Sequence, residues 1–320
     1  MMKVLKERWV ISMKKIDIIV PVYNEESNIV KFYEKIKEEL KGLKYNIIFV
    51  NDGSKDNSII ELKKVYERDK DIVKIISFSR NFGKDAAMYA GLKFSKADYA
   101  CIIDADLQQN PKYLVEMYNF LEGNNDYDCI AMVQKSKKRF LETSFYKFIS
   151  SLSNLHFESG ASDFRMFRKS VVKSLVSLGE VNRFTKGMFS YVGFNTFYKE
   201  YIVEERVSGV SKFNRLNQFK YAFDGITSFS NKPLRISTFL GAITTFVSFV
   251  FFVYLLVKCL IIGDDVSGIS SLMCALLFVS GVQLLCIGVL GEYIGKVYNE
   301  VKGRPVFIAK EVIGFDDSIL

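Results

Sequence analysis

Residues 101–108 read CIIDADLQ, an apolar run that ends in two aspartates, Asp104 and Asp106. The run is typical of a buried parallel strand, and α/β sheets bind ligands beyond the carboxyl ends of such strands. At this spacing the two carboxylates can approach one Mg²⁺ or Mn²⁺, which takes its other ligands from phosphate oxygens and water. The alternative is that they only cap the next helix or lie solvated in a loop. Asn110 and Pro111 already supply that helix start, which leaves the acidic pair for another role.

Other apolar runs flank this strand and alternate with amphipathic stretches. We predict strands at residues 16–22, 45–50, 72–79, 98–104 and 129–133. Short strands that alternate with helices indicate an α/β fold with a mostly parallel sheet. The ligand site is therefore expected just after the strands, at their carboxyl ends.

Polar sequences also follow the first three predicted strands. Residues 20–26 read VPVYNEE and residues 50–54 read VNDGS, and both place acidic side chains where a base and ribose could be bound. The alternative is turn chemistry, because Asp-Gly favours tight turns and Ser54 can cap a helix. Residues 79–84 read SRNFGK, whose cations and exposed amides could meet a diphosphate, although the pattern is not a P-loop.

The composition excludes two common kinds of catalytic centre. The chain has one histidine, His156, and five cysteines without a CxxC pair. It therefore has too few parts for a zinc site or a Ser-His-Asp triad. The excess of 44 Lys and Arg over 36 Asp and Glu suits nucleic acid or an anionic membrane face. This charge gathers beside long apolar segments and no nucleic-acid-binding module is recognisable, so we expect no nucleic-acid partner.

Two long apolar segments, 236–262 and 269–291, predict transmembrane helices. The first has one interior charge, Lys258, and reaches roughly 40 Å as a helix, enough to cross the hydrocarbon layer. Two buried helices of a soluble core would be shorter. The link at 263–268, GDDVSG, is acidic and basic residues flank the outer ends, so both chain ends are predicted to face the cytoplasm.

The segment before the first span carries an apolar stripe together with lysine and arginine. Such a stripe at helical spacing is ordinarily part of a core. Because this stripe runs directly into a membrane segment, we favour an interfacial helix that lies on the bilayer.

Several motifs occur together and in order. VPVYNE at 20–25, VNDGS at 50–54, SRNFGK at 79–84 and DADLQ at 104–108 resemble family 2 glycosyltransferases of the polyprenyl-phosphate hexosyltransferase type. Dolichol-phosphate mannose synthases and bacterial undecaprenyl-phosphate glucosyltransferases are similar. The resemblance continues through SDFR at 162–165, NRF at 182–184 and the paired membrane segments, and so covers nearly everything from residue 16 onward.

The resemblance implies a Rossmann-like, GT-A type domain that transfers a hexose from a nucleotide-sugar to polyprenyl phosphate with inversion. UDP-glucose or UDP-N-acetylglucosamine is the expected donor, and undecaprenyl phosphate the expected acceptor. The residues implied to line the nucleotide-sugar are Pro21, Tyr23, Glu25, Asp52, Lys84 and Asp104. Asp104 and Asp106 would bind Mg²⁺ or Mn²⁺ with Gln108 beside the metal, and Asp106 and Asp163 are the implied catalytic residues.

Asp163 resembles the carboxylate that lies near the acceptor. An acceptor phosphate is already anionic near neutral pH and needs little help from a base, so Asp163 could orient a cation or the sugar instead. A structural ion pair with Arg165 or Arg168 is the alternative. The cations predicted to bind the acceptor phosphate are Lys135, Arg139, Arg206 and Lys212. For each of these, simple attraction to anionic lipid head groups is the alternative.

The predicted organisation has six parts. They are an N-terminal extension at 1–15, a cytosolic glycosyltransferase domain at 16–212, an interfacial helix and linker at 213–235, transmembrane helices at 236–262 and 269–291, and a cytosolic tail at 292–320. This describes a multi-pass protein of the cytoplasmic membrane that makes its sugar-lipid on the cytosolic leaflet. We therefore expect a separate flippase as a partner, and a homo-oligomer.

The sequence departs from the family pattern at two places, and two other functions are alternatives to it. Asn51 stands where many relatives have a second aspartate, and SGAS at 159–162 stands where a glycine beside the aspartate is usual. A processive polysaccharide synthase would carry a QxxRW motif, whereas Trp9 is the only tryptophan. A non-catalytic membrane scaffold would leave the concurrence of the aspartates in these motifs unexplained.

Overall fold

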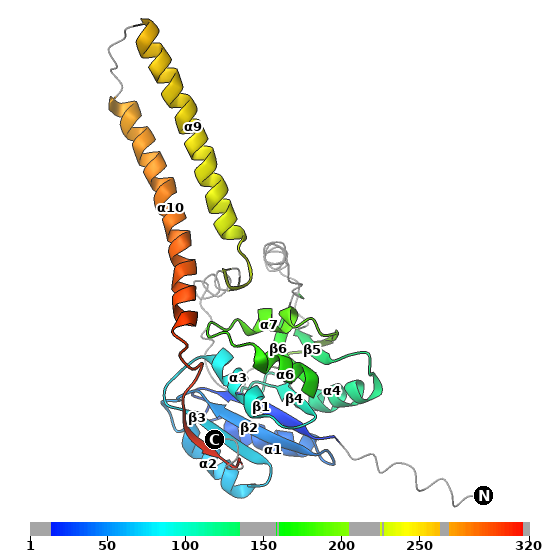
Figure 1. Cartoon of the computed structure of the whole chain (residues 1–320). Helices are drawn as coiled ribbons and strands as arrows, with labels where there is room; N and C mark the ends of the chain where they lie inside the picture. The colour runs from blue at the N-terminus through cyan, green and yellow to red at the C-terminus, as the bar shows by residue number, and fades with distance from the viewer. Residues whose placement is uncertain are drawn as a thin grey trace, which may run out of the picture. The chain divides into compact units, whose positions relative to one another are not determined.

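The computed structural model describes residues 14–134, 158, 160–204, 225, 227–262 and 269–315 (Figure 1). These residues fall into two compact units. The described residues between 14 and 204 form the first unit together with 305–315, and those between 225 and 304 form the second.

The first unit is built on a mixed eight-stranded sheet with the order β7-β5-β6-β4-β1-β2-β3-β8. The strands are β1 Ile16–Val22, β2 Tyr45–Asn51, β3 Val73–Phe78, β4 Tyr99–Ile102, β5 Cys129–Gln134, β6 Ala161–Arg168, β7 Thr196–Tyr201 and β8 Ala309–Ile313. β1 to β4 run parallel, and β6 lies antiparallel between β4 and β5. The predicted α/β class and its first five strands are confirmed, whereas β6, β7 and β8 were not predicted.

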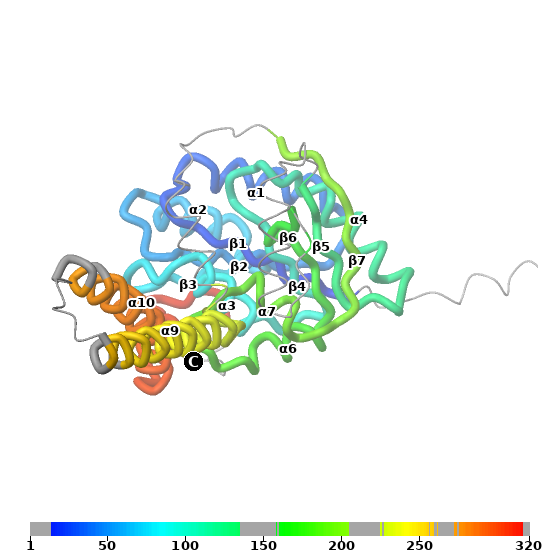
Figure 2. Tube along the Cα trace, turned by 90° about the horizontal axis from the view of Figure 1, so that it is seen from above, coloured from blue at the N-terminus to red at the C-terminus, as the bar shows by residue number. Residues whose placement is uncertain are grey.

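Helices cover both faces of the sheet. They are α1 Ile29–Glu39, α2 Ser58–Arg68, α3 Lys84–Phe94, α4 Lys112–Gly123, α6 Lys169–Ser177 and α7 Thr185–Tyr191. The core on one face joins alternate residues of β1, such as Ile18 and Val20, to apolar residues of α1, α2 and α4. Ile48 and Val50 of β2 point to the other face, where they pack with Ala87 of α3. Figure 2 shows these layers on either side of the sheet. This alternation is the strand period of two that places successive side chains on opposite faces.

The second unit contains two long helices, α9 Lys232–Ile262 and α10 Ile269–Val301. Both are long and apolar enough to cross a membrane, with mean hydropathies of 2.1 over Lys232–Leu255 and 1.9 over Ala275–Val301. Polar contacts join α10 to the residues just before α9: the Lys296 ammonium donates to Ser228 Oγ at 3.0 Å and the Tyr293 hydroxyl donates to the Ser230 carbonyl at 2.5 Å. α10 ends ten residues beyond the predicted span at 269–291. Most of the predicted interfacial helix lies outside the described residues.

Candidate active site

Lys84 brings together two carboxylates that are far apart in the sequence. It is the first residue of α3, and its ammonium lies 2.7 Å from Asp104 Oδ1 and 3.0 Å from Asp163 Oδ2. Asp104 follows β4 and Asp163 lies in β6, the antiparallel neighbour of β4. The site is therefore assembled at the carboxyl end of β4, where α/β sheets bind their ligands.

The electrostatics of this cluster favour the charged forms of Lys84 and Asp163. Burial acts to lower the pKa of Lys84, but the carboxylates of Asp104 and Asp163 outweigh it and raise that pKa above its ordinary value. Burial acts to raise the pKa of Asp163, but the neighbouring cations Lys84 and Lys186 bring it down to about 2. Asp163 Oδ1 is buried without a hydrogen-bond partner in the described part of the chain. An unpaired buried acceptor costs ~1–3 kcal/mol, which marks this oxygen for contact with a ligand.

Asp163 forms its ion pair with Lys84, and not with Arg165 or Arg168 as the structural alternative had it. Arg165 Nε donates to the Ser162 carbonyl at 3.1 Å, and its guanidinium lies over the ring of Phe189. Arg168 donates to backbone carbonyls that include Tyr127 O at 2.9 Å. Within the described residues the partner that Asp163 contacts is thus Lys84.

A buried glutamine orients the first aspartate of the acidic pair. The side chain of Gln109 accepts from the Asp104 amide at 3.0 Å and donates to Asp104 Oδ2 at 3.1 Å. Gln108 donates its backbone N–H to Asp106 Oδ1 at 3.1 Å. Leu107, between them, has a φ of 62°, the left-handed region that non-glycine residues adopt at some energetic cost. The sequence analysis did not name Gln109, because the burial that sets it apart from its neighbour cannot be read from a local pattern.

The residues present fit a hard divalent cation that a diphosphate shares. No group of three or more His, Cys, Asp or Glu gathers as metal ligands among the residues that the structure describes. A Mg²⁺ site completed by substrate phosphates needs only one or two protein carboxylates, and Asp104 and Asp106 are the pair predicted for it. Asp104 contacts Lys84 through Oδ1 and Gln109 through Oδ2, so a metal would share these oxygens with protein groups. The role of Gln108 beside the metal stays a prediction.

Asp52 organises the loop that carries Lys84. It is 3% exposed, and it accepts hydrogen bonds from Phe82 N at 2.6 Å, Gly83 N at 3.0 Å and Asn81 Nδ2 at 2.9 Å. Burial raises the pKa of Asp52, and the two amide bonds oppose the rise. Both oxygens are thus used by the protein, and a contact with base or ribose stays a prediction.

The loops after β1 and β2 are tied together at the same edge. Asn24 N donates to Ser54 Oγ at 3.0 Å and Glu25 N donates to Ser58 Oγ at 2.9 Å. Asn51 is buried and donates to Ser77 Oγ at 2.9 Å, so this departure from the family pattern holds β2 to β3. Pro21, Tyr23 and Glu25 are half-buried at this edge, which suits the role predicted for them without testing it.

Sequence analysis also missed Asp85, which follows Lys84. Asp85 Oδ1 accepts from the Thr185 backbone N–H at 3.3 Å and so joins the start of α3 to the start of α7. Lys135, Arg139, Arg206 and Lys212, the cations predicted for the acceptor phosphate, lie outside the described residues.

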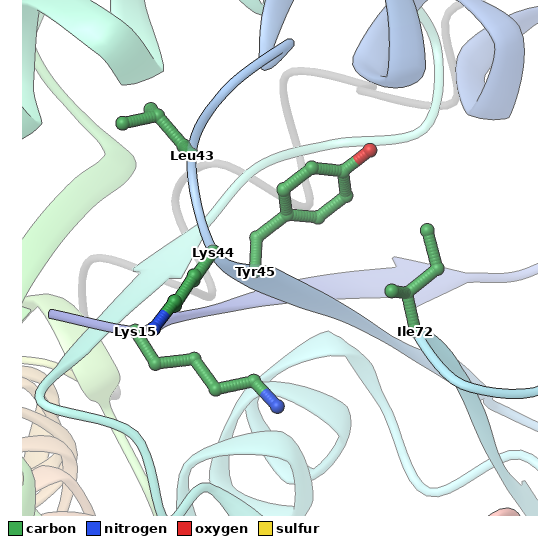
Figure 3. Close-up of a pocket in the computed structure, with 5 residues that line it drawn as sticks. All are labelled: Lys15, Leu43, Lys44, Tyr45 and Ile72. Carbon is green, nitrogen blue, oxygen red and sulfur yellow. The ribbon is translucent and has the colours of Figure 1, made fainter. Parts of the chain in front are cut away.

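A pocket at the opposite edge of the sheet is not part of this site. Lys15, Leu43, Lys44, Tyr45 and Ile72 line it (Figure 3). These residues precede or begin β1, β2 and β3, at the amino ends of the strands. Ligands of α/β sheets bind at the carboxyl ends, so the candidate site is the cluster around Lys84.

Comparison with known proteins shows the family of the chain. Residues 17–176 match the model described as glycosyl transferase family 2, and residues 232–297 match the one described as GtrB C-terminal hairpin. The chain belongs to glycosyl transferase family 2. It is a glycosyltransferase.

The relatives of this glycosyltransferase span almost its whole length. The bactoprenol glucosyl transferase of Shigella phage SfII is 40% identical over 93% of this chain and 98% of its own. An uncharacterized glycosyltransferase of Synechocystis is 37% identical over 94% of this chain and 96% of its own. A prophage bactoprenol glucosyl transferase homolog of Escherichia coli is 39% identical over 93% and 99%.

Solved structures of other glycosyltransferases are much more distant. Glucosyl-3-phosphoglycerate synthase from Mycobacterium tuberculosis, in complex with Mn²⁺, UDP-glucose and phosphoglyceric acid, is 16% identical with a TM-score of 0.49 over 68% of this chain and 79% of its own. At that distance the likeness says nothing about the substrate or the metal of this glycosyltransferase.

Proposed function

We propose that this glycosyltransferase transfers a hexose from UDP-glucose or UDP-N-acetylglucosamine to undecaprenyl phosphate, with inversion. The product would be a polyprenyl-monophosphate-sugar for cell-envelope glycosylation. The observation that carries the proposal is the position of Lys84, between Asp104 on the predicted donor side and Asp163 on the predicted acceptor side. Relatives named bactoprenol glucosyl transferase, matched over nearly the whole chain, support the lipid acceptor.

Each side chain of the site has a separate role in the proposed reaction. Asp104 and Asp106 would hold Mg²⁺ or Mn²⁺, which supplies positive charge to stabilise the leaving diphosphate. An oxygen of the acceptor phosphate forms the new bond to the anomeric carbon, and the nucleoside diphosphate leaves with the electron pair of the broken bond. Because the acceptor oxygen is already anionic, Asp163 acts by holding the Lys84 ammonium in place, and that ammonium offsets negative charge where donor and acceptor meet.

The two long helices support a place for this reaction at the cytoplasmic membrane. α9 and α10 would cross it as a hairpin, with the catalytic domain and both chain ends in the cytosol. Arg206 and Lys212, with Lys135 and Arg139, would bind the acceptor phosphate near the membrane surface. A separate flippase would then carry the sugar-lipid across, and the enzyme would act as a homo-oligomer.

Substitution of the second aspartate tests the proposal. Asp106→Asn should lower transfer of labelled glucose from UDP-glucose to undecaprenyl phosphate by at least about a hundredfold, because loss of a charge-stabilising group costs that much. EDTA should have the same effect on the wild type. Asp126→Asn, at an exposed loop position, is the control and should keep wild-type activity. Full transfer by Asp106→Asn, or by the wild type stripped of metal, would contradict the proposal.

A further inference from the structure

The segment that follows the second apolar helix returns to the sheet of the first unit. β8 pairs antiparallel with β3, and the backbone N–H of Ser79 donates to the Ile308 carbonyl at 3.0 Å (Figure 1, red). Sequence analysis predicted residues 292–320 as a tail outside the catalytic domain. Residues 309–313 instead form an edge strand of its sheet, directly beside the start of loop 79–84.

Phe307 links this segment to the loop through a row of aromatic rings. Its ring stacks on Phe78, the last residue of β3, with centroids 5.0 Å apart. Phe78 in turn meets the edge of Phe82 at 5.7 Å, and Phe82 lies within loop 79–84. Phe307 also contacts Tyr89 of α3 edge-on at 6.2 Å. It therefore packs against residues on both sides of Lys84, in the strand before the loop and in the helix after it.

The opposite side of the loop is held by residues that follow β2. Asp52 accepts the hydrogen bonds from Phe82 and Gly83 described above. Gly53 has a φ of 62°, and a Cβ built there would lie 2.4 Å from the carbonyl carbon of Arg80. The backbone of loop 79–84 thus fits between Asp52 and Gly53 on one side and the Phe78–Phe307 pair on the other.

We infer that Phe307 and β8 form a positioning element of the active site. They hold loop 79–84 in the conformation that places the Lys84 ammonium between Asp104 and Asp163. Phe307 acts through Phe78, whose ring contacts Phe82 in the loop, and is therefore a positioning residue. The effect on the donor rests on the proposed function, whereas the effect on the loop does not.

Two measurements on matched variants test this inference. Phe307→Ala removes the ring that meets Phe78, whereas Phe315→Ala removes a ring of the same apolar cluster that meets Phe94 at 5.1 Å, at the far end of α3. Ile308→Ala changes a neighbouring side chain that is 52% exposed. Phe307→Tyr keeps the ring and should behave as the wild type. If Phe307→Ala does not fold, Phe307→Leu replaces it in both measurements.

The first measurement is amide hydrogen exchange of a peptide that covers residues 79–86, in which the Phe82 and Gly83 amides report on their bonds to Asp52. The second is the KM for UDP-glucose at saturating undecaprenyl phosphate. Phe307→Ala should make the exchange about tenfold faster, because the loop opens more often. It should also raise this KM about tenfold, because Lys84 is no longer held in position. Phe315→Ala and Ile308→Ala should change neither.

Equal exchange in Phe307→Ala and Phe315→Ala, or an equal donor KM in the two variants, would overturn the inference. A wild type that transfers no glucose would overturn the proposed function alone. The hydrogen exchange would then still decide whether Phe307 holds the loop.

Discussion

Lys84 and Asp163 form an ion pair within a partly enclosed site, and their charges depend on each other. The side chain of Lys84 is 43% exposed, so part of it is open to solvent. The side chain of Asp163 is 16% exposed and is more dependent on its partner. At the scale of single residues, the pair is the contact on which the proposed chemistry depends.

This pair predicts how stability changes with pH. The pKa of Asp163 is lowered from 3.8 to about 2, chiefly by Lys84 acting against burial. A lowered pKa stabilises the folded protein above the ordinary value, and that stabilisation is lost as the pH falls through the folded-state value. Asp163→Asn should therefore cost roughly 2 kcal/mol of the free energy of unfolding at neutral pH, and much less near pH 2. Thermal denaturation in detergent across this range measures the difference. A difference that is independent of pH would show that the ion pair contributes no stability.

Loop 79–84 is the element on which the site depends, and close backbone packing shapes it. Gly53 lies against the backbone of Arg80 and Asn81. A Cβ added at this position would lie 2.4 Å from the Arg80 carbonyl carbon and 2.6 Å from the Asn81 nitrogen. Both contacts are with backbone atoms, which cannot move aside as the end of a flexible side chain can. A side chain at residue 53 must therefore displace the loop.

Comparison of Gly53→Ala with Gly42→Ala separates the effect of close packing from the effect of backbone strain. Both glycines have positive φ, of 62° and 90°, but a Cβ at Gly42 would meet nothing within 4 Å. Gly42→Ala should cost about 1 kcal/mol of stability from strain alone and leave activity unchanged. Gly53→Ala should cost at least about 2 kcal/mol and lower transfer tenfold or more, because it also moves the loop that carries Lys84. Thermal denaturation and initial rates check both effects, and equal losses in the two variants would contradict the role of close packing.

The whole molecule joins the sheet of a family 2 glycosyltransferase to two helices of membrane-spanning length. Nucleotide-sugars are cytosolic, so the side of the membrane on which the catalytic domain lies decides where a sugar-lipid can form. Topology is therefore part of the proposed function.

Cysteine labelling tests this topology. Single cysteines in place of Ser267, in the link between the helices, and of Ser318, in the tail, would be introduced after removal of the five native cysteines. An impermeant maleimide on intact cells should label the cysteine at 267 and not the one at 318. The acidic link is predicted to lie outside the cell, and the basic flanks of the helices are predicted to stay in the cytosol. The variant at 318 should be labelled only after the cells are opened, which serves as the control. Labelling at 318 alone on intact cells would reverse the topology.

Much of this architecture could be predicted from local patterns. The first strand was predicted at 16–22, as the structure has it, because nearly continuous apolar residues bounded by polar turns define a covered parallel strand. The long helices were predicted from their length and apolar composition. Asp104 and Asp106 were identified because polar residues at a strand end lie where ligands bind. β6 was not predicted, because ASDFRMFR mixes charged and apolar residues without the continuous run of a central strand.

The sequence by itself determined the α/β class and the membrane-length helices, because both depend on periodicity or composition within one segment. The ligand edge and the metal role of the acidic pair stay predictions. Tertiary structure alone decided that Lys84 meets Asp163, two residues far apart in the sequence, and that Gln109 holds the Asp104 side chain. It also decided that the tail supplies β8 and the ring of Phe307. These contacts join segments distant in sequence, and they depend on strand order and burial, which no local pattern specifies.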